Sequence, residues 1–566
     1  MTLLRILPAA ILVLGIGVAE SKSCPEEIYG GWTTSLPVDV LLRTQLTVSN
    51  MDEGEFVVNQ PPIRFVGRAG SDSNELRGFV YFGQGAYRVT LPKAEDGTWA
   101  GRWGPLPISE SSVPFDLYFD DDGEGGTGGY LFFKDQRMPS LYGLGARCDG
   151  GLITFKEMNL GLTFTGKFDD EFTTLTTEAT ALGGVATISW RRMSEEQLAV
   201  PAGSPVVPPR DANFVTVVDQ APEATGDGWL TARPSEKDVN IAPLNALIKS
   251  VAAGELPLAH SVLVAKSGKL VIEEYFYGFD RDTLHDMRSA SKSIASTLVG
   301  LAVDRELMCG AGARALDFFD YESYGNWSDS KADITLRHLM TMSSGLDAND
   351  ADRDSVASEN TYQWQREQPD WIKLALDAPM IAEPGKRVIY GSANPMILGG
   401  VLESAIGGRV EWFADEALFN PLGIDHYKIF MRPMDAGVYL GGGMYLRPRD
   451  MLKIGQLYLD DGKWNGTQIL SKEWVQESFD KYGRLEPIDR NGNQYGYLWW
   501  HENYEVGEKV IASIEARGNG GQYIFVVPEL DVVAVITAGN YRGGLEMTRQ
   551  SQRMFASYVL PALTGE

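Results

Sequence analysis

The stretch Met287-Arg288-Ser289-Ala290-Ser291-Lys292-Ser293-Ile294-Ala295 runs into an apolar segment, Ile294–Val303, and predicts a helix that opens at Ser289. At the N-terminus of such a helix the N–H of Ser289 is free to donate, and the helix dipole favours a nearby anion. Lys292 follows three residues later on the same face. Apolar neighbours would lower the proton affinity of this lysine by desolvation, as a base or a proton relay requires. The alternative is that Ser289 only caps the helix.

The tetrapeptide Ser-x-x-Lys occurs three times, beginning at Ser289, Ser328 and Ser478, so it carries little weight alone. Ser328 lies in a polar stretch and Ser478 follows an amphipathic segment at its polar edge, whereas Ser289 precedes a strongly apolar helix. The context therefore favours Ser289 as a nucleophile. The chain contains no G-x-S-x-G elbow, phosphate-binding loop or dinucleotide fingerprint, which disfavours an α/β-hydrolase triad and nucleotide chemistry.

Six blocks of the sequence, in order, resemble the serine β-lactamase-related family. Within it the chain is most similar to the branch of 6-aminohexanoate-dimer hydrolases and class C-like, family VIII esterases. The resemblance covers roughly residues 240–562 and implies an antiparallel sheet flanked by helices, with a helical subdomain. The blocks are residues 287–295, 334–346, 390–394, 441–450, 495–500 and 518–522.

The resemblance implies a serine hydrolase that works through an acyl-enzyme on Ser289. Lys292 and Tyr390 would share the proton transfers, and which of them is the general base stays open. Backbone N–H groups of Ser289 and Asn519 would bind the oxyanion. Tyr390 could otherwise be a core tyrosine with a satisfied hydroxyl. Four further residues would support or line the site: Ser392, Gly518, Gly520 and Trp500.

The sequence departs from the penicillin-recognising members of the family at one block. Those enzymes use a Lys-Thr-Gly strand to meet the substrate carboxylate, whereas residues 515–521 here read Glu-Ala-Arg-Gly-Asn-Gly-Gly. Arg517 could supply the positive charge, but the lysine and threonine are absent. The departure favours a small-molecule ester or non-peptide amide as substrate. A D,D-carboxypeptidase, or a weak β-lactamase, is the alternative enzyme.

The N-terminal third predicts an all-β antiparallel barrel or sandwich, because short apolar runs alternate with Gly, Asp, Asn and Pro. A change to proline-rich composition follows and predicts an extended linker. We therefore expect a signal peptide at 1–19, a β domain at 20–200, a linker at 201–239 and a hydrolase domain at 240–566. The predicted strands are 56–58, 78–82, 87–91, 115–119, 130–133 and 152–155.

The first residues predict export. Arg5 precedes an apolar run, Ile6–Val18, that ends in small residues at the positions a signal peptidase recognises. The run is too short to span a bilayer, and no later run is long enough. We therefore expect a periplasmic or secreted protein without a stable membrane span. A Cys24–Cys148 disulfide would fit that setting, and buried free thiols are the alternative.

The charge balance bears on partners. The chain carries 50 Lys and Arg against 76 Asp and Glu, a net charge of −26, and such a surface repels nucleic acid. The five histidines occur singly and no Cys-x-x-Cys is present, so we expect no metal and no organic cofactor. The oligomeric state is not predicted. A catalytically idle cell-envelope or glycan-binding protein on the same fold is the alternative outside the enzymes.

Overall fold

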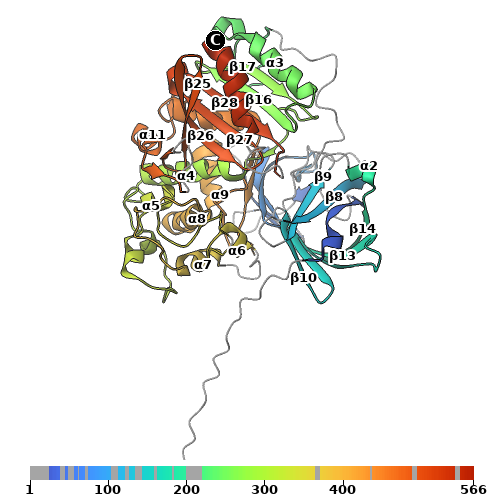
Figure 1. The fold of residues 1–566 in the computed structure, drawn as a ribbon. Coiled ribbons are helices and arrows are strands. Elements are labelled where there is room, and N and C mark those ends of the chain that lie inside the picture. The colour runs from blue at the N-terminus through green and yellow to red at the C-terminus, as the bar shows by residue number, and fades with distance from the viewer. Residues whose placement is uncertain are drawn as a thin grey trace, which may run out of the picture.

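The structure is a computed structural model, drawn in Figure 1. It describes residues 24–37, 45–48, 56–60, 63–69, 74–102, 112–121, 127–133, 143–157, 162–181, 184–198, 219–352, 354–363, 370–433, 436–486, 494–541 and 549–565. The predicted signal peptide and the first part of the predicted linker, residues 201–218, lie outside these ranges. Within the described ranges, no helix has the length and apolar character that crossing a membrane requires.

Eight N-terminal strands form a closed antiparallel barrel, which confirms the predicted antiparallel barrel. Aromatic side chains fill its interior: Phe155 and Phe164 lie opposite each other in register and stack with ring centroids 4.7 Å apart. The indole N–H of Trp190 donates to Thr177 Oγ1 at 3.0 Å. In order around the barrel, the strands are β1 (Gly30–Pro37), β14 (Gly184–Arg192), β13 (Thr174–Ala181), β12 (Leu162–Phe168), β11 (Leu152–Glu157), β10 (Gly143–Asp149), β9 (Thr127–Phe133) and β8 (Ser112–Asp121).

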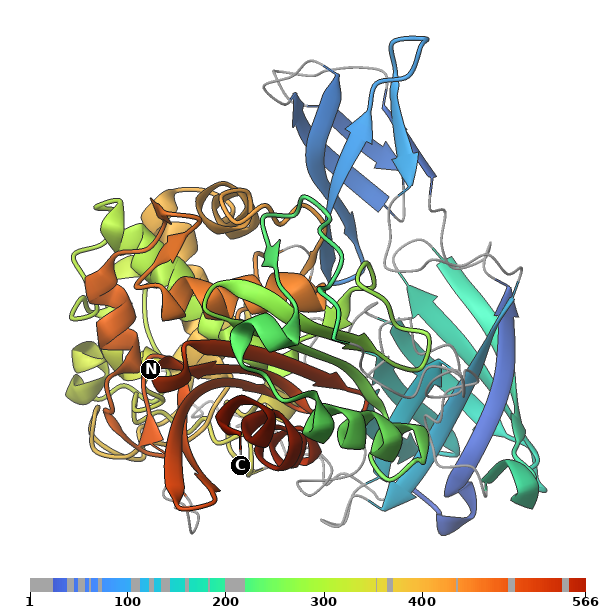
Figure 2. The same ribbon diagram turned by 90° about the horizontal axis from the view of Figure 1, so that it is seen from above.

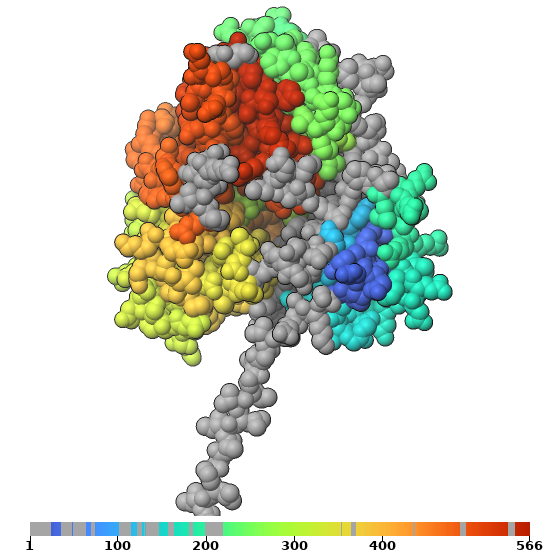
Figure 3. Space-filling view, in the orientation of Figure 1, coloured from blue at the N-terminus to red at the C-terminus, as the bar shows by residue number. Residues whose placement is uncertain are grey.

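Four N-terminal strands do not belong to the barrel, and the predicted strands 56–58, 78–82 and 87–91 are among them. After β1 the chain leaves the barrel and forms these strands, which join short strands of the C-terminal part in one seven-stranded sheet. Figure 2 shows these blue strands projecting apart from the barrel, and Figure 3 shows the barrel beside the yellow-to-red C-terminal part. The sheet order is β18 (His285–Asp286), β20 (Tyr445–Leu446), β19 (Lys428–Phe430), β6 (Gly85–Pro92), β5 (Glu75–Phe82), β4 (Ile63–Ala69) and β3 (Phe56–Gln60).

The β5–β6 hairpin lies between two hydrophobic cores. Successive strand residues point to opposite faces, so Phe79 and Ala86 pack into the C-terminal core while Val80 and Tyr87 pack into the barrel-side core. A strand that is buried on both faces has a nearly continuous apolar sequence, and the segment Gly78–Phe82 has such a sequence. The N-terminal strands and the C-terminal part are therefore joined by shared packing as well as by backbone hydrogen bonds.

A buried ion pair fixes the hairpin to the C-terminal part. Arg88 is 1% exposed, and its Nε donates to Asp415 Oδ1 at 2.7 Å. The same carboxylate accepts from the Tyr427 hydroxyl at 2.6 Å and from Asn420 at 2.9 Å. The Arg88 N–H also donates to the Tyr427 carbonyl at 2.9 Å. Every partner of Arg88 on the C-terminal side thus comes from one short segment, residues 415–427.

The C-terminal part is built on a nine-stranded sheet, antiparallel except at the β15 edge. Residues 261–265, 270–275, 523–527 and 532–537 lie in four of its strands. Strand order is β15 (Leu230–Thr231), β17 (Lys269–Tyr275), β16 (Ala259–Lys266), β28 (Val532–Ala538), β27 (Gln522–Val527), β26 (Lys509–Gly518), β25 (Trp500–Val506), β24 (Gln494–Tyr495) and β23 (Gly483–Arg484).

Helices cover both faces of this sheet, as predicted. One face packs on α4 and α10, with Leu263, Ile524 and Val535 in a shared core. The other face packs on α3 and the C-terminal helices, with Phe525 and Ile536 in a second core. The elements named here are α3 (Ile241–Ala252), α4 (Lys292–Asp304), α10 (Pro448–Leu459), α13 (Gln550–Met554), η9 (Phe555–Val559) and α14 (Leu560–Thr564).

A helical block lies below the sheet in Figure 1, around α8, which packs on α4, α5 and α7. It comprises η4 (Ala315–Phe318), η5 (Asp329–Asp333), α5 (Leu336–Met340), α6 (Glu359–Gln363), α7 (Trp371–Asp377), α8 (Ala393–Ile406), α9 (Val410–Ala414) and η6 (Asp415–Phe419). The remaining elements are η1 (Glu26–Ile28), α2 (Glu195–Leu198), η2 (Pro234–Lys237), η3 (Arg288–Ser291), α11 (Lys472–Phe479), η8 (Pro528–Leu530) and the small pairs β2 (Gln45–Val48) with β7 (Trp99–Arg102) and β21 (Lys463–Trp464) with β22 (Thr467–Gln468).

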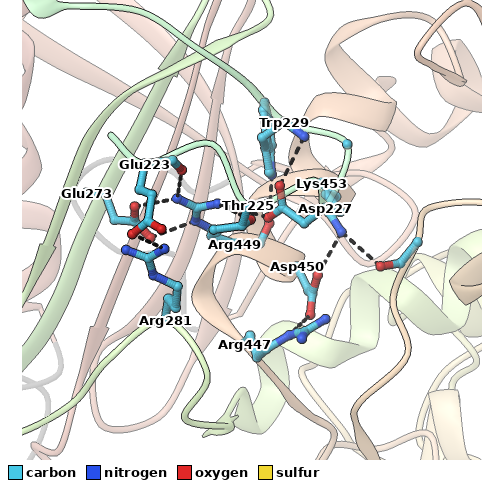
Figure 4. Close-up of polar contacts among 12 residues, drawn as sticks. Glu223, Thr225, Asp227, Trp229, Glu273, Arg281, Arg447, Arg449, Asp450 and Lys453 are labelled. Atoms are coloured by element: carbon cyan, nitrogen blue, oxygen red, sulfur yellow. Dashed lines mark hydrogen bonds and ion pairs between the residues drawn. The ribbon is translucent and has the colours of Figure 1, made fainter. Parts of the chain in front are cut away.

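The second half of the predicted linker is anchored on α10. The Arg449 guanidinium forms an ion pair with Glu273 at 2.6 Å and donates to Asp227 at 3.1 Å and Thr225 at 2.8 Å (Figure 4). Arg449 also donates to the carbonyl of Glu223 at 2.8 Å. Residues 223–227 are therefore held against the C-terminal part by one buried side chain.

We predict that Arg88→Ala lowers the free energy of unfolding of the C-terminal part by about 3–5 kcal/mol, because Asp415 then keeps a buried charge without a cation. The control is Arg77→Ala on the neighbouring strand, where Arg77 and Glu75 are 46% and 45% exposed. That pair contributes about 0–1 kcal/mol. Urea unfolding measures both, and equal effects would contradict the anchoring role.

Candidate active site

Ser289 lies in a tight turn that leads into the buried helix α4. The 3-10 turn η3 covers Arg288–Ser291, and α4 begins at Lys292, three residues later than the predicted helix. Asp286 on β18 holds the turn: its carboxylate accepts from the Arg288 N–H at 2.9 Å and forms an ion pair with the Arg288 side chain at 2.9 Å. The N-cap residues are Met287 for η3 and Ser291 for α4, so capping does not account for Ser289.

The structure brings together the three residues expected to carry the chemistry. Lys292 is 1% exposed, and its Nζ donates to Ser289 Oγ at 2.8 Å. The same ammonium donates to the Gly441 carbonyl and lies 5.0 Å from the centre of the Tyr390 ring. Lys292 therefore connects the hydroxyl of Ser289 with the phenol of Tyr390.

The sequence predicted a lowered proton affinity for Lys292, and this prediction is wrong. Burial does lower it, but the pKa of Lys292 is raised above its ordinary value because Tyr390, Glu359 and Asp350 together outweigh the burial. Opposite charges close to a buried amine favour its protonated form. The resting site thus holds Lys292 as an ammonium ion. The two carboxylates lie far from the Ser-Ala-Ser-Lys motif in sequence, so the local pattern could not reveal them.

Tyr390 is held on a loop just before α8. Its carbonyl accepts from the Asp350 N–H at 3.0 Å, and its ring lies 5.7 Å from the ring of Trp500. The N–H and the hydroxyl of Ser392 both donate to Asp350 Oδ2, each at 2.7 Å. Ser392 therefore supports the loop that carries Tyr390 through Asp350.

The end of β26 reaches the nucleophile turn, and only glycine fits there. A Cβ on Gly518 would lie 2.2 Å from the Met287 carbonyl oxygen and 3.2 Å from the Ala290 nitrogen. Asn519 follows and lines the same pocket as Ser289. Gly520 has φ +83°, a left-handed conformation that favours glycine. This arrangement puts the backbone of residue 519 beside Ser289, and its role toward an oxyanion stays a prediction.

Ser289 opens into a pocket of about 80 Å³. Its walls come from four separated segments: the nucleophile turn, α6, the strand β19 with the glycine block after it, and the β26 end. The lining residues are Arg288, Ser289, Glu359, Asn360, Gln363, Phe430, Tyr439, Gly441, Gly442, Gly443 and Asn519. The glycine block belongs to a recognisable sequence motif, whereas Glu359, Tyr439 and Phe430 were not predicted because none belongs to a motif with catalytic spacing.

The two neighbouring tryptophans have different environments. Trp499 is fully buried and packs on Tyr458 and Phe479 at 4.7 and 5.6 Å, so it belongs to the core. Trp500 lies beside Tyr390 and beneath the Arg517 guanidinium, which is 4.8 Å from the centre of its ring. Trp500 is therefore a neighbour of the Tyr390 side of the site.

Arg517 is already engaged by carboxylates. Its guanidinium pairs with Glu515 at 2.7 Å and with Glu502 at 3.0 Å, and its side chain is 12% exposed. A guanidinium whose charge is neutralised by two carboxylates attracts a further anion only weakly. Among the described residues, no group of three or more His, Cys, Asp or Glu side chains is arranged to hold a metal ion.

The fold and this arrangement define the class of the protein, a serine hydrolase on a β-lactamase-type scaffold. The family model described as Beta-lactamase matches residues 252–551, and the chain belongs to that family. It is 24% identical over 287 residues to the 6-aminohexanoate-dimer hydrolase of Paenarthrobacter ureafaciens, covering 48% of this chain and 70% of that protein.

Two further similarities are to proteins of Aspergillus terreus. The chain is 32% identical over 136 residues to monacolin J acid methylbutanoyltransferase of Aspergillus terreus, covering 23% of this chain and 32% of that protein. The solved structure of simvastatin synthase from Aspergillus terreus superposes with a TM-score of 0.44 at 17% identity, covering 57% of this chain and all of that one (100%).

We predict that Gly518→Ala damages the site, because its Cβ cannot be placed without moving the β26 end or the turn of Ser289. The variant should lose about 1–3 kcal/mol of unfolding free energy. Its esterase activity should fall by a larger fraction than its free energy of unfolding does. Gly312→Ala is the control, since a Cβ there meets no atom within 4 Å. Full esterase activity in Gly518→Ala would contradict the close approach.

Proposed function

We propose that this protein is an exported serine hydrolase that cleaves small-molecule esters or amides through an acyl-enzyme on Ser289. The observation that carries the proposal is the contact of 2.8 Å between Lys292 Nζ and Ser289 Oγ, with Tyr390 beside the same ammonium. A hydroxyl held by a buried amine next to a phenol is the arrangement that nucleophilic catalysis needs. Ser289, Lys292 and Tyr390 are the proposed catalytic residues.

Acylation begins when Ser289 Oγ attacks the substrate carbonyl carbon. Because Lys292 is an ammonium ion, the group that takes the Ser289 proton is Tyr390, which reacts as a phenolate paired with that ammonium and becomes a neutral phenol. The N–H groups of Ser289 and Asn519 stabilise the oxyanion. The C–O or C–N bond to the leaving group then breaks, and Tyr390 returns the proton to the departing oxygen or nitrogen.

Deacylation repeats these steps with water. Tyr390 accepts a proton from the attacking water, the bond between the acyl carbon and Ser289 Oγ breaks, and Ser289 recovers its proton. No metal or organic cofactor takes part in this scheme. The family's hydrolase and acyltransferase relatives support acyl transfer as the reaction class.

The environment of Arg517 favours esters and uncharged amides over penicillin-like or D-alanyl-D-alanine substrates. Those substrates present a carboxylate that needs a cation at the strand beside Ser289. Arg517 is the cation at that strand, and it is paired with Glu515 and Glu502. A catalytically idle protein that only binds its ligand would not require the contact between Ser289 and Lys292.

Export is supported by a disulfide. Cys24 and Cys148 are joined, whereas Cys309 is free and exposed. Disulfides persist in oxidising compartments such as the periplasm or the extracellular space. Together with the signal-type sequence at residues 1–19, the disulfide supports a periplasmic or secreted protein.

The nucleophile is tested by burst-phase hydrolysis of p-nitrophenyl acetate and butyrate. We expect wild type to give a burst and an acyl adduct in the intact mass. Ser289→Ala should lose the adduct and at least ~10³-fold in rate, and Tyr390→Phe should lose ~10²–10⁴-fold. Ser328→Ala, at a second Ser-x-x-Lys motif, is the matched control and should behave like wild type. Equal rates in wild type and Ser289→Ala would refute the assignment and leave the idle binding protein as the better account.

The substrate preference is tested with a chromogenic β-lactam beside the esters. We expect ester turnover to exceed β-lactam turnover in kcat/KM, since Arg517 has no free charge for the β-lactam carboxylate. Faster turnover of the β-lactam, or of a D-alanyl-D-alanine peptide, would instead support the peptidase alternative.

The compartment is tested on protein purified from the periplasm or medium of a bacterial host. Alkylation of the denatured, unreduced protein should modify one thiol, that of Cys309, and prior reduction should raise the number to three. Retention of residues 1–19 in the mature protein, or three free thiols without reduction, would contradict export.

A further inference from the structure

Two carboxylates from one loop and the helix after it lie behind the pair of Lys292 and Tyr390. Asp350 is bound on three sides: its N–H donates to the Tyr390 carbonyl, its Oδ2 accepts twice from Ser392, and its Oδ1 accepts from the Glu359 N–H at 2.8 Å. Asp350 therefore fixes both the loop of Tyr390 and the first residue of α6.

Glu359 stands between Asp350 and the pocket. Its Oε1 accepts from the Tyr439 hydroxyl and from Gln363 Nε2, each at 2.9 Å, and its Oε2 lies 3.4 Å from the Ser392 hydroxyl. The Tyr439 hydroxyl is also 2.7 Å from the hydroxyl of Tyr362. These partners are neutral, so they orient the Glu359 carboxylate without cancelling its charge.

The two carboxylates act on one another and on Lys292. Burial and the neighbouring Glu359 raise the pKa of Asp350 to about 6, and Lys292 opposes that rise. Above that pH the Asp350 carboxylate is charged and contributes to the raised pKa of Lys292. The ionisable groups that act on Lys292 are Tyr390, Glu359 and Asp350.

We propose that Asp350 and Glu359 are positioning residues: through the Tyr390 carbonyl and Ser392 they hold the loop of Tyr390 at the pocket of Ser289. This inference rests on the proposed function of Ser289. The pair touches neither Ser289 nor the reacting carbonyl in the proposed mechanism. Its negative charge also helps to raise the pKa of Lys292, which burial alone would lower.

The negative charge of Asp350 and Glu359 predicts how kcat/KM depends on pH. In wild type the acidic pair helps to raise the pKa of Lys292 above its ordinary value, so kcat/KM should not fall within the accessible alkaline range. Removing one negative charge weakens the effect that raises the pKa of Lys292, while burial still lowers it. Lys292 should therefore lose its proton at lower pH. A fall in kcat/KM should then appear about 1–3 pH units lower, inside that range.

The experiment compares Asp350→Asn, Glu359→Gln and Glu359→Asp in the full-length enzyme. The pH dependence of kcat/KM for p-nitrophenyl butyrate is measured with subtraction of the background reaction. We expect the alkaline fall in Asp350→Asn and Glu359→Gln and its absence in Glu359→Asp, which keeps the charge. Glu477→Gln is the matched control, because Glu477 also accepts from a tyrosine hydroxyl, that of Tyr497 at 3.0 Å.

Three results would overturn the inference. One is a profile with wild-type shape in both charge-removing variants. The second is a uniform loss at every pH with a lower melting temperature, which a purely structural role would give. The third is the same alkaline fall in Glu359→Asp. Each is distinct from failure of the proposed function, in which Ser289→Ala keeps the burst whatever the carboxylate variants do.

Discussion

The hydrogen bond between Lys292 and Ser289 is the interaction on which the site depends. It requires a turn that directs the Ser289 side chain back toward the first residue of α4, and Asp286 holds that turn. It also requires Lys292 to be buried and still charged, which Tyr390, Glu359 and Asp350 provide. Segments from β18, α4, α6 and the loop before α8 all converge on this one contact, so its geometry depends on the whole C-terminal part.

The N-terminal strands contribute to that geometry from a distance. The β5–β6 hairpin pairs with β19, and β19 carries Phe430 into the pocket of Ser289. The side chain of Gln84 in the hairpin turn donates to the Met431 carbonyl at 3.1 Å, and the backbone carbonyl of Gln84 accepts from the Met431 N–H at 2.8 Å. The hairpin is buried on both faces. The barrel is therefore connected to the pocket wall through a sheet, and not only through the proline-rich segment.

The sequence predicted what local patterns can encode. The Ser-Ala-Ser-Lys motif before an apolar run located Ser289 and Lys292, and the alternating runs predicted the barrel. Contacts between distant segments were not predictable in this way. The runs 78–82 and 87–91 were recognised as strands, but the sheet that they join is completed by β19, which pairs with residues 85–87 from more than 300 residues away in the chain. The raised pKa of Lys292 was missed for the same reason, since Asp350 and Glu359 approach it only in the folded chain.

The proposed catalytic role of Ser289 requires that its hydroxyl be activated by Lys292. It is tested most directly by labelling the native protein with a fluorophosphonate and mapping the modified residue by peptide mass spectrometry. The account predicts one adduct, on the peptide that contains Ser289, and its loss in Lys292→Ala although the hydroxyl remains. An adduct on another serine, or undiminished labelling of Ser289 in Lys292→Ala, would contradict it.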